Sequence, residues 1–381
     1  MKKILIGTSA LVAAAAFAGS ANAADPIKLS VGGYGAVMVG YASNDDGYVT
    51  ALDQEVSAVD VKGDNEIHFS GKTTLDNGLT VAVKYEFEAG GRSADKTNDE
   101  WSIAVSGNFG TIKTGADDNA LMMIHNNAPV VGGRLFNGGA ADNDVLGGAY
   151  VLRPTSAKNV ELLADTGINT GGDSESISYI SPSFAGFTFG ASYVPSVDQG
   201  ENQAGATNQS AGVVSDGYGV GLAYAGKFGD VTVGADIGWL TADNGNTVDS
   251  HNQYQAGLKF GYAGFEVGGA YRALQQDGIE GRKDQDGRSW EAGVSYKTGP
   301  YGIALTYFDI SVEESQTINQ NIGDSEAQMW QLSTSYNMGP GVDLVGGLAY
   351  VSFDSTDNNG VSGALNSNDG WVAATGLSLT F

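Results

Sequence analysis

The residue types that commonly perform catalysis are scarce and widely spaced in this 381-residue sequence. It contains no cysteine and three histidines, His68, His125 and His251. The motifs G-x-S-x-G, G-x-x-x-x-G-K-[ST] and H-E-x-x-H are absent, so no activated serine, phosphate-binding loop or zinc-peptidase site is indicated. Asp284-Gln285-Asp286-Gly287 is similar to the start of a calcium loop but lacks the glutamate that completes one. These observations argue against an enzyme. They predict no cofactor, apart from divalent cations held loosely by acidic loops.

Alternating side chains define the elements that must position any functional group. From Leu79 to Glu88, large apolar residues alternate with Thr, Ala, Lys and Glu. The same period of two recurs in segments 231–239, 265–272, 301–307, 330–336 and 371–381. This period places successive side chains on opposite faces of a β-strand. The sequence therefore predicts strands with one apolar face and one face that carries polar groups such as Lys84, Asp236 and Arg272.

The connections between these strands alternate between short turns and long polar segments. Asp76-Asn77-Gly78 and Thr298-Gly299-Pro300 are short turns, whereas the segments between turns are rich in Asp, Asn, Gly and Ser. This rhythm is typical of membrane barrels, and an even strand number lets such a sheet close with its apolar face toward lipid and its polar face toward a water-filled lumen. We count about sixteen strands, near 28–43, 65–76, 79–90, 99–107, 110–115, 174–182, 185–195, 216–227, 229–240, 252–262, 264–274, 288–298, 300–310, 326–337, 341–353 and 370–381.

All five tryptophans fall at the long-loop end of a predicted strand. Trp101, Trp290, Trp330 and Trp371 each follow a long connection, and Trp239 precedes one. A second set of aromatic residues marks the short-turn end: Phe109, Phe184, Phe228, Tyr262, Tyr301 and Phe381. Amphipathic aromatic rings prefer the interface between lipid and water, so the sequence predicts an aromatic belt at each rim of the barrel.

The first residues predict export. Lys2 and Lys3 precede an uncharged, mostly apolar run, and Ala21-Asn22-Ala23 is a small-residue cleavage motif. These are the parts of a secretory signal peptide, with cleavage expected between Ala23 and Ala24. We therefore predict a signal peptide at 1–23 and one barrel domain at 24–381. The formal net charge of −25 argues against nucleic acid as a partner, because phosphate carries the same sign of charge.

The final strand ends in Gly376-Leu377-Ser378-Leu379-Thr380-Phe381. Together with the signal peptide and the alternating strands, it resembles the Gram-negative general porins, and the stretch from Lys62 to Gly115 resembles their alphaproteobacterial branch. The resemblance implies an all-β fold, a transmembrane antiparallel β-barrel in the bacterial outer membrane with an inward-folded third long loop. It also implies passive diffusion of small hydrophilic solutes, a homotrimer, contact with outer-membrane lipid and lipopolysaccharide, and recognition of Phe381 by the barrel-insertion machinery.

One long connection, residues 116–160, has no alternating pattern, and it is the third long connection along the chain. It therefore resembles the loop that narrows general porins. Acids on such a loop would face basic residues on the wall and set up a field across the pore. The loop candidates are Asp117, Asp118, Asp142 and Asp144, with Arg134 on either side, and the wall candidates are Lys72, Lys84, Lys113 and Lys28. His68 shares the lumen-facing phase of these lysines.

Acids also concentrate in two other long segments. Residues 44–64 hold six acids and one lysine, and residues 309–326 hold five acids and no base. Because like charge at a pore mouth repels anions, we predict a preference for cations. Two alternatives stay open: a substrate-specific channel on the same fold, and a secreted all-β adhesin, which would need neither the tryptophans at one rim nor the aromatic terminus. The glycines at 32, 33, 35 and 40 suggest close contact between subunits at the first strand.

Overall fold

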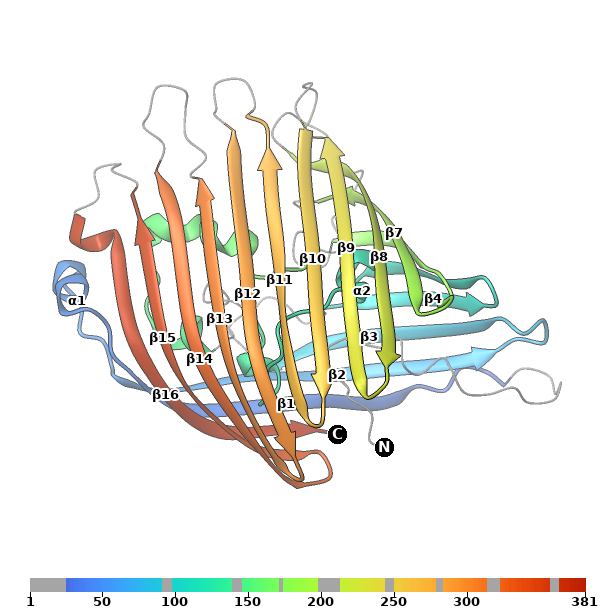
Figure 1. Ribbon diagram of the computed structural model, residues 1–381, viewed down its shortest axis with the longest axis horizontal. Coiled ribbons are helices and arrows are strands. Elements are labelled where there is room, and N and C mark those ends of the chain that lie inside the picture. The colour runs from blue at the N-terminus through green and yellow to red at the C-terminus, as the bar shows by residue number, and fades with distance from the viewer. Residues whose placement is uncertain are drawn as a thin grey trace.

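The predicted strands form one closed barrel. The computed structural model describes residues 25–90, 98–138, 146–170, 174–197, 213–243, 250–278, 284–313, 323–356 and 363–381. Within these residues every strand is antiparallel to its neighbours in sequence, and the last strand pairs with the first (Figure 1). The sixteen strands there are β1 (Ser30–Ala42), β2 (Val59–Thr74), β3 (Thr80–Gly90), β4 (Trp101–Gly107), β5 (Gly110–Ala116), β6 (Glu175–Ile180), β7 (Phe187–Ser196), β8 (Ser215–Phe228), β9 (Val231–Asp243), β10 (Ser250–Tyr262), β11 (Phe265–Gln276), β12 (Gln285–Thr298), β13 (Tyr301–Glu313), β14 (Asp324–Gly339), β15 (Val342–Ser355) and β16 (Ser367–Thr380). The predicted fold class is confirmed.

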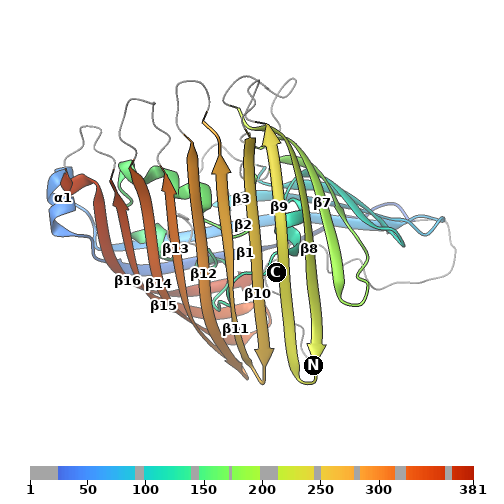
Figure 2. The same cartoon turned by 45° about the horizontal axis from the view of Figure 1, so that its top comes forward.

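Helical segments are short and lie in the long connections. They are α1 (Asp46–Leu52), α2 (Ala120–Ile124), η2 (Arg134–Phe136), α3 (Leu146–Tyr150), η3 (Thr155–Leu163) and η4 (Gly363–Leu365). Among the residues that the structure describes, no helix is long and apolar enough to cross a bilayer. The short turns lie at one rim of the barrel, at the bottom of the view in Figure 1 for β8 to β16 and at its right for β2 to β5, and α1 lies at the opposite rim (Figure 2).

The strand ends differ from the prediction mainly at the long-loop rim. β2 begins at Val59, where we expected 65, and β13 continues to Glu313, where we expected 310. The extension of β2 pairs with β1, with Val59 opposite Tyr41. The alternation also continues there, with Val59 and Val61 exposed on the outer face and Asp60 and Lys62 on the inner face, so the pattern extends further than our prediction of this strand.

The outer face of the barrel carries large apolar side chains in alternate positions. Ile237 is 61% exposed and Leu305 is 44% exposed, and Val39 is exposed in the same way on β1. A soluble protein rarely leaves a continuous apolar surface of this size in water. The band is the surface that a barrel presents to hydrocarbon.

The inner face is not uniformly polar, which corrects the expectation of a polar, water-facing lumen wall throughout. On β2 and β3 the inward positions carry charged residues such as Glu66, His68 and Lys84. On β13 and β15 they carry Phe308, Ile310 and Phe353, all buried. The barrel interior therefore has a charged side and an apolar side.

The barrel closes where β1 pairs with β16, and the two strands pack closely at this seam. Phe381 and Gly33 exchange backbone hydrogen bonds of 3.0 and 3.1 Å. Gly376 lies opposite Met38, and a Cβ there would collide with the backbone of Val37 and Met38. The glycines of β1 have close neighbours within the same chain, since Gly33 meets the backbone of Glu66 and Gly40 meets the ring of Tyr150.

Residues 1–24 lie outside the described part of the chain. The predicted signal peptide and its cleavage between Ala23 and Ala24 are therefore still predictions.

Candidate functional site

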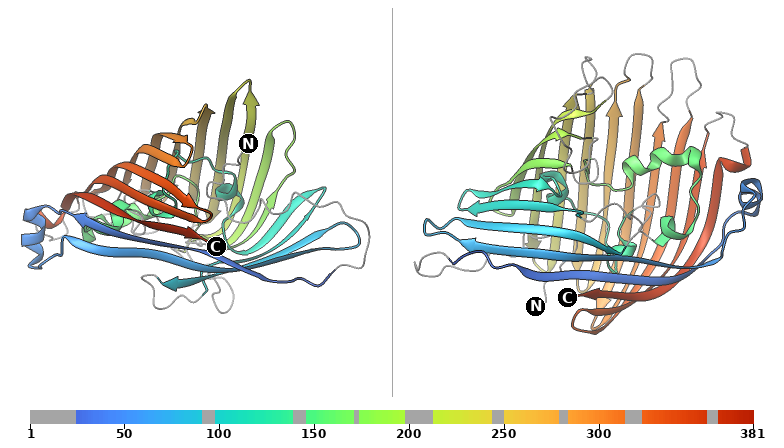
Figure 3. Two further views of the ribbon diagram at one scale, coloured as in Figure 1. Left: turned by 90° about the horizontal axis from the view of Figure 1, so that it is seen from below. Right: turned by 180° about the vertical axis from the view of Figure 1, so that it is seen from behind.

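The connection between β5 and β6, residues 117–174, enters the barrel, and we name it loop L3. Its helix α2 contacts β7 and β8, α3 contacts β1, β15 and β16, and η3 contacts β13 to β15. Figure 3 shows these helical segments between the opposite walls of the barrel. We predicted an inward loop at 116–160, and beyond this predicted end Ile168 and Thr170 are also buried.

Loop L3 begins with a capped helical turn that packs on glycines of the wall. The side chain of Asn119 accepts hydrogen bonds from the backbone N–H groups of Leu121 (2.8 Å) and Met122 (3.2 Å), as an N-cap residue does. Leu121 then lies over Gly219 and Gly221 of β8, where a Cβ would come within 2.9 Å of its side chain. The missing side chains of β8 thus make the space that α2 fills.

Charged side chains of β9 and β12 bind two separate parts of loop L3, residues 125–128 and Thr166. Asp236 accepts hydrogen bonds from the backbone N–H of Asn126 at 2.8 Å and contacts Nδ1 of His125 at 2.9 Å. Glu291 accepts hydrogen bonds from the backbone N–H of Ala128 and from the hydroxyl of Thr166, each at 2.9 Å. These inward charges fasten the loop to the wall and do not face open water.

Arg272 on β11 is a third anchor of the same kind. Its guanidinium donates to the backbone carbonyl of Asp165 at 3.2 Å and to Gln253 Oε1 at 2.6 Å. The side chain of Gln255 binds two separate parts of the loop. It accepts a hydrogen bond from the N–H of Ile168 at 2.8 Å and donates one to the carbonyl of Leu121 at 3.0 Å. Loop L3 is therefore fixed by several hydrogen bonds to buried wall groups.

Three predicted site residues meet at the start of loop L3. Asp117 contacts Nζ of Lys113 at 3.0 Å and Nζ of Lys84 at 3.3 Å, and all three side chains are buried. Burial alone would raise the pKa of Asp117, but the two ammonium groups outweigh it and hold that pKa below its usual value. Burial raises the pKa of Asp118 next to it. An electric field across the pore opening would need positive and negative charges on opposite sides of it. In this cluster the carboxylate and the two ammonium groups are in contact.

Replacing Asp117 with asparagine is expected to lower the free energy of unfolding by about 3 kcal/mol at pH 7, because it leaves two buried lysines without their shared carboxylate. A carboxylate whose pKa is lowered by folding stabilises the protein above its unfolded pKa of roughly 4, and this stabilisation is lost as the pH falls through the folded pKa. The difference between wild type and variant should therefore shrink below about pH 4. Urea unfolding in detergent, followed by tryptophan fluorescence, measures this. Asp230→Asn on an exposed short turn is the control, and an unchanged midpoint for Asp117→Asn at pH 7 would contradict the prediction.

The other predicted constriction residues are not brought into this cluster. Lys72 is exposed on the inner face of β2, and Lys28 precedes β1, with Asp25 at 4.0 Å. Arg134 lies in η2, where only its backbone is described. Asp142 and Asp144 lie outside the described residues. Their part in a constriction stays a prediction.

An acidic group on the inner faces of β2, β3 and the start of β4 was not singled out from the sequence. It consists of Asp64, Glu66, Glu86, Glu88 and Glu100. Nε2 of His68 contacts Glu66 at 2.7 Å, and Nζ of Lys84 contacts Glu86 at 3.0 Å and Glu100 at 2.8 Å. The signal was present in the sequence: alternate residues of β2 from Asp60 to Lys72 are all polar.

Two triads within this group have the geometry to hold a cation. The ligand atoms of Glu66, His68 and Glu86 lie within 4.8 Å of one another, and so do those of Asp64, Glu66 and Glu88. Mixed carboxylate and imidazole donors suit transition metals such as zinc, whereas carboxylates alone suit calcium or magnesium. Both triads lie on the barrel wall, and Asp64 is also the last residue of the acidic segment 44–64; binding of divalent cations by the acidic loops stays a prediction.

The apolar side of the interior is covered by loop L3. Phe136, Leu146 and Leu163 of the loop form one buried cluster with wall residues that include Phe308 and Phe353. The sequence carried a signal for this cluster that our alternation analysis did not use. In β13 the apolar residues change face, from Ile303 and Leu305 outside to Phe308 and Ile310 inside.

The predicted tryptophans lie near the long-loop rim, and four of them are exposed on the outer face. Tyrosines that sequence analysis did not include join them in a row across neighbouring strands. The ring of Tyr307 lies 5.0 Å from that of Trp290 and 4.6 Å from that of Trp330, and Tyr350 lies 5.0 Å from Trp371. At the short-turn rim, Phe184, Phe228 and Phe381 are exposed. The geometry matches the predicted belts, whose contact with a lipid interface is still a prediction.

Comparison with known proteins agrees with this architecture. The family model described as Gram-negative porin matches residues 10–357. Two curated relatives are each 27% identical over 318 residues, covering 73% of this chain and 81% of theirs: a monosaccharide porin from Halomonas sp. and a major outer membrane protein from Halomonas elongata. Among solved structures, an anion-selective porin from Comamonas acidovorans is similar with a TM-score of 0.58 and 17% identity, over 93% of this chain and 100% of that one.

The closed antiparallel barrel, the apolar outer band and the loop packed inside it are the parts that a solute channel in the outer membrane requires. The catalytic motifs that would indicate an enzyme are absent from the sequence. The chain belongs to the Gram-negative porin family and forms an outer-membrane channel for the diffusion of solutes, not an enzyme.

Proposed function

We propose that the protein is a passive pore that passes small hydrophilic solutes and prefers cations to anions. The observation that carries the preference is the acidic wall of β2 to β4. On its inner face the side chains of Asp64, Glu66 and Glu86 are buried, and those of Glu88 and Glu100 are half-buried. Lys84 contacts two of them and is shared with Asp117. Carboxylates that line a pore attract cations and repel anions.

The similarity to an anion-selective porin does not decide the selectivity of this chain. At 17% identity the two proteins share a fold. Ion selectivity depends on the charges of individual side chains at the narrow part of a pore, and the same barrel can carry either sign of charge. Loop L3 covers the apolar side of the interior, so the acidic side is the part of the wall that the proposal assigns to the ion path.

Neutralising the acidic wall should weaken the preference for cations. We expect the wild-type channel to give a cation-to-anion permeability ratio above one. The triple variant Asp64→Asn, Glu66→Gln, Glu88→Gln should lower that ratio about threefold or more, because three nearby charges are removed. The measurement is the reversal potential in planar bilayers under a salt gradient. Asp76→Asn with Asp230→Asn, both on short turns, is the matched control. Anion preference in the wild type would refute the proposal.

A relative named monosaccharide porin favours small neutral sugars as a further class of solute. We include them in the proposed function, since a passive pore also transmits uncharged solutes that fit its width. Swelling of proteoliposomes in a panel of sugars of increasing size tests this. Equal rates for sugars and for an impermeant polymer would count against it.

We further propose a homotrimer, as the resemblance to general porins implies. Light scattering of the detergent complex, corrected for bound detergent, should give three times the mass of one chain. A mass of one chain under conditions that keep the barrel folded would contradict this part of the proposal.

A further inference from the structure

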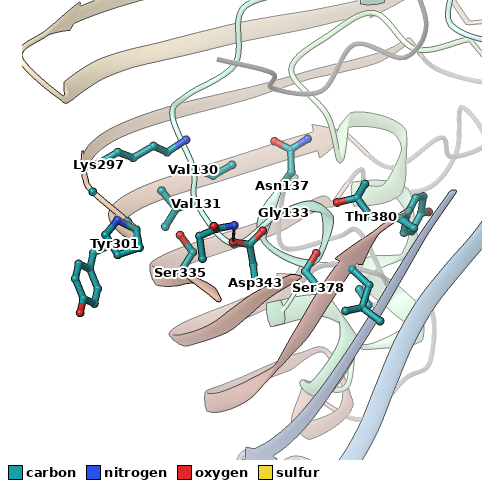
Figure 4. Close-up of a pocket in the computed structure, with 18 residues that line it drawn as sticks. Val130, Val131, Gly133, Asn137, Lys297, Tyr301, Ser335, Asp343, Ser378 and Thr380 are labelled. Atoms are coloured by element: carbon teal, nitrogen blue, oxygen red, sulfur yellow. Dashed lines mark hydrogen bonds between the residues drawn. The ribbon is translucent and has the colours of Figure 1, made fainter. Parts of the chain in front are cut away.

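A cavity of about 580 Å³ lies inside the barrel at the short-turn rim. Its roof is formed by residues Val130 to Gly133 of loop L3 together with Asn137, and its floor by the inner faces of β12 to β16 and of β1 (Figure 4). Cavities of roughly 300 to 1,000 Å³ are typical of sites for small molecules. The size and position raise the question of which solute the cavity fits.

The roof of the cavity is held in place by the wall. The backbone N–H of Val131 donates to the hydroxyl of Ser333 at 3.4 Å, and the side chain of Gln331 donates to the carbonyl of Phe136 at 2.8 Å. Gly132 and Gly133 have φ angles of 97° and 83°, so the chain turns there in a conformation that other residues adopt only with strain. The cavity is therefore formed before any solute arrives, which reduces the entropy lost on binding.

The floor of the cavity is a lateral row of inward positions on adjacent strands. Lys297 of β12 lies opposite Gly302 of β13, which lies opposite Ser335 of β14. On the next strands Asn337 lies opposite Asp343, and Asp343 opposite Ser378. Gly302 brings no side chain, so the centre of the row is hollow.

The row carries two charged residues: Lys297 lies at its β12 end, and Asp343 on β15 lies within it, next to Ser378 of β16. Three strand spacings separate Lys297 on β12 from Asp343 on β15, which corresponds to about 14 Å along the wall. The carboxylate of Asp343 also accepts a hydrogen bond from the Asn337 amide at 2.9 Å. Ser335 and Asn337 lie on the strand between the two charged residues, and Ser378 lies beyond Asp343 on β16.

The uncharged hydroxyl and amide groups that line the cavity match one class of solute. The hydroxyls of Ser335 and Ser378 can each donate and accept a hydrogen bond, and the amides of Asn137 and Asn337 carry both donors and acceptors. A polyhydroxylated solute presents the same mixture, whereas an ion would bind best to groups of opposite charge. In Figure 4 the ring of Tyr301 points away from the cavity, whereas Tyr34 of β1 is a second aromatic residue in its lining.

We infer that this cavity is a binding subsite for a small neutral polyhydroxylated solute of the size of a monosaccharide, on the short-turn side of loop L3. The inference rests on the proposed diffusion channel and adds a place where the solute pauses. A solute that comes from the long-loop side reaches the cavity after it has passed the loop. A solute from the short-turn side enters it directly.

The experiment measures ion current through single channels in planar bilayers while glucose is added to each side in turn. Glucose bound in the cavity should reduce the wild-type current in a saturable way, with faster onset from the short-turn side. The double variant Ser335→Ala, Asn337→Ala should raise the half-saturating glucose concentration about tenfold, because two hydrogen-bonding groups are lost. Lys227→Gln, at the exposed end of β8 and outside the cavity, is the control, which should leave the half-saturating glucose concentration within about twofold.

The outcomes separate the inference from the function on which it rests. Intact ion current with no saturable effect of glucose, or an unchanged half-saturating concentration in the double variant, overturns the subsite and leaves the channel standing. Absence of any ion current from the folded wild type overturns the proposed function itself. If the double variant fails to fold, Ser335→Ala alone should raise the half-saturating concentration about threefold, and no change there also overturns the subsite.

Discussion

Replacing Gly376 with alanine is expected to abolish the folded barrel. A Cβ at this position would overlap the backbone oxygen of Val37 and lie 2.8 Å from Cα of Met38, so β1 would have to move away from β16. That movement breaks the backbone hydrogen bonds that close the sheet, and open strand edges are not tolerated in hydrocarbon because unsatisfied backbone groups cost several kcal/mol each. Gel mobility with and without heating, after refolding into detergent, should show no folded form.

Gly339 provides the matched control for this substitution. It lies near the end of β14, and a Cβ there would meet no atom within 4 Å. Gly339→Ala should therefore refold with the yield of the wild type. A folded, conducting Gly376→Ala variant would show that the seam can widen and would refute the prediction.

Removing loop L3 is expected to destabilise the barrel and not simply to widen it. If residues 117–174 are replaced by a short linker, the wall side chains that now pack against the loop face water, among them Met38, Phe308, Ile310, Val351 and Phe353. Each such side chain gains about 1.5 to 3 kcal/mol from burial, so the total loss is on the order of 10 kcal/mol. Folded proteins are stable by roughly 5 to 15 kcal/mol, so little of this stability would remain.

Refolding yield and urea midpoint in detergent measure this effect. The matched control shortens the connection between β15 and β16, which leaves the buried cluster intact. An L3-deleted barrel that refolds with the wild-type midpoint and conducts with a larger current would show that the apolar wall tolerates water, and the prediction would be wrong.

The number and order of the strands followed from the sequence because lipid imposes a strict rule on one face. Ile237 and Trp239 of β9 must point outward, so Asp236 and Gly238 must point inward, whatever the partner strand is. The ends of the strands were less predictable. Val59 and Val61 continue the outward pattern of β2 beyond its predicted start, but two apolar residues in a polar segment are too few to mark the end of a strand.

The candidate site was predictable where it depends on local order and unpredictable where it depends on packing. Asp117 directly follows β5, and Lys113 lies four residues earlier on the inner face, so their proximity could be anticipated. The anchoring of loop L3 to the wall could not be predicted from the sequence, because the side chains of Asp236 and Glu291 could equally have faced water. Their partners are backbone N–H groups of Asn126 and Ala128, which carry no signature in the sequence.

Closure between the first and last strands sets the order of maturation. β1 finds one of its two partners, β2, early in the chain, but its other partner is β16, at the far end. Until β16 has been synthesised and delivered, the growing sheet keeps two free edges that can pair with any other exposed strand and aggregate. Contacts between such distant segments also form slowly. The strand topology therefore requires a protein that binds and shields these edges during export.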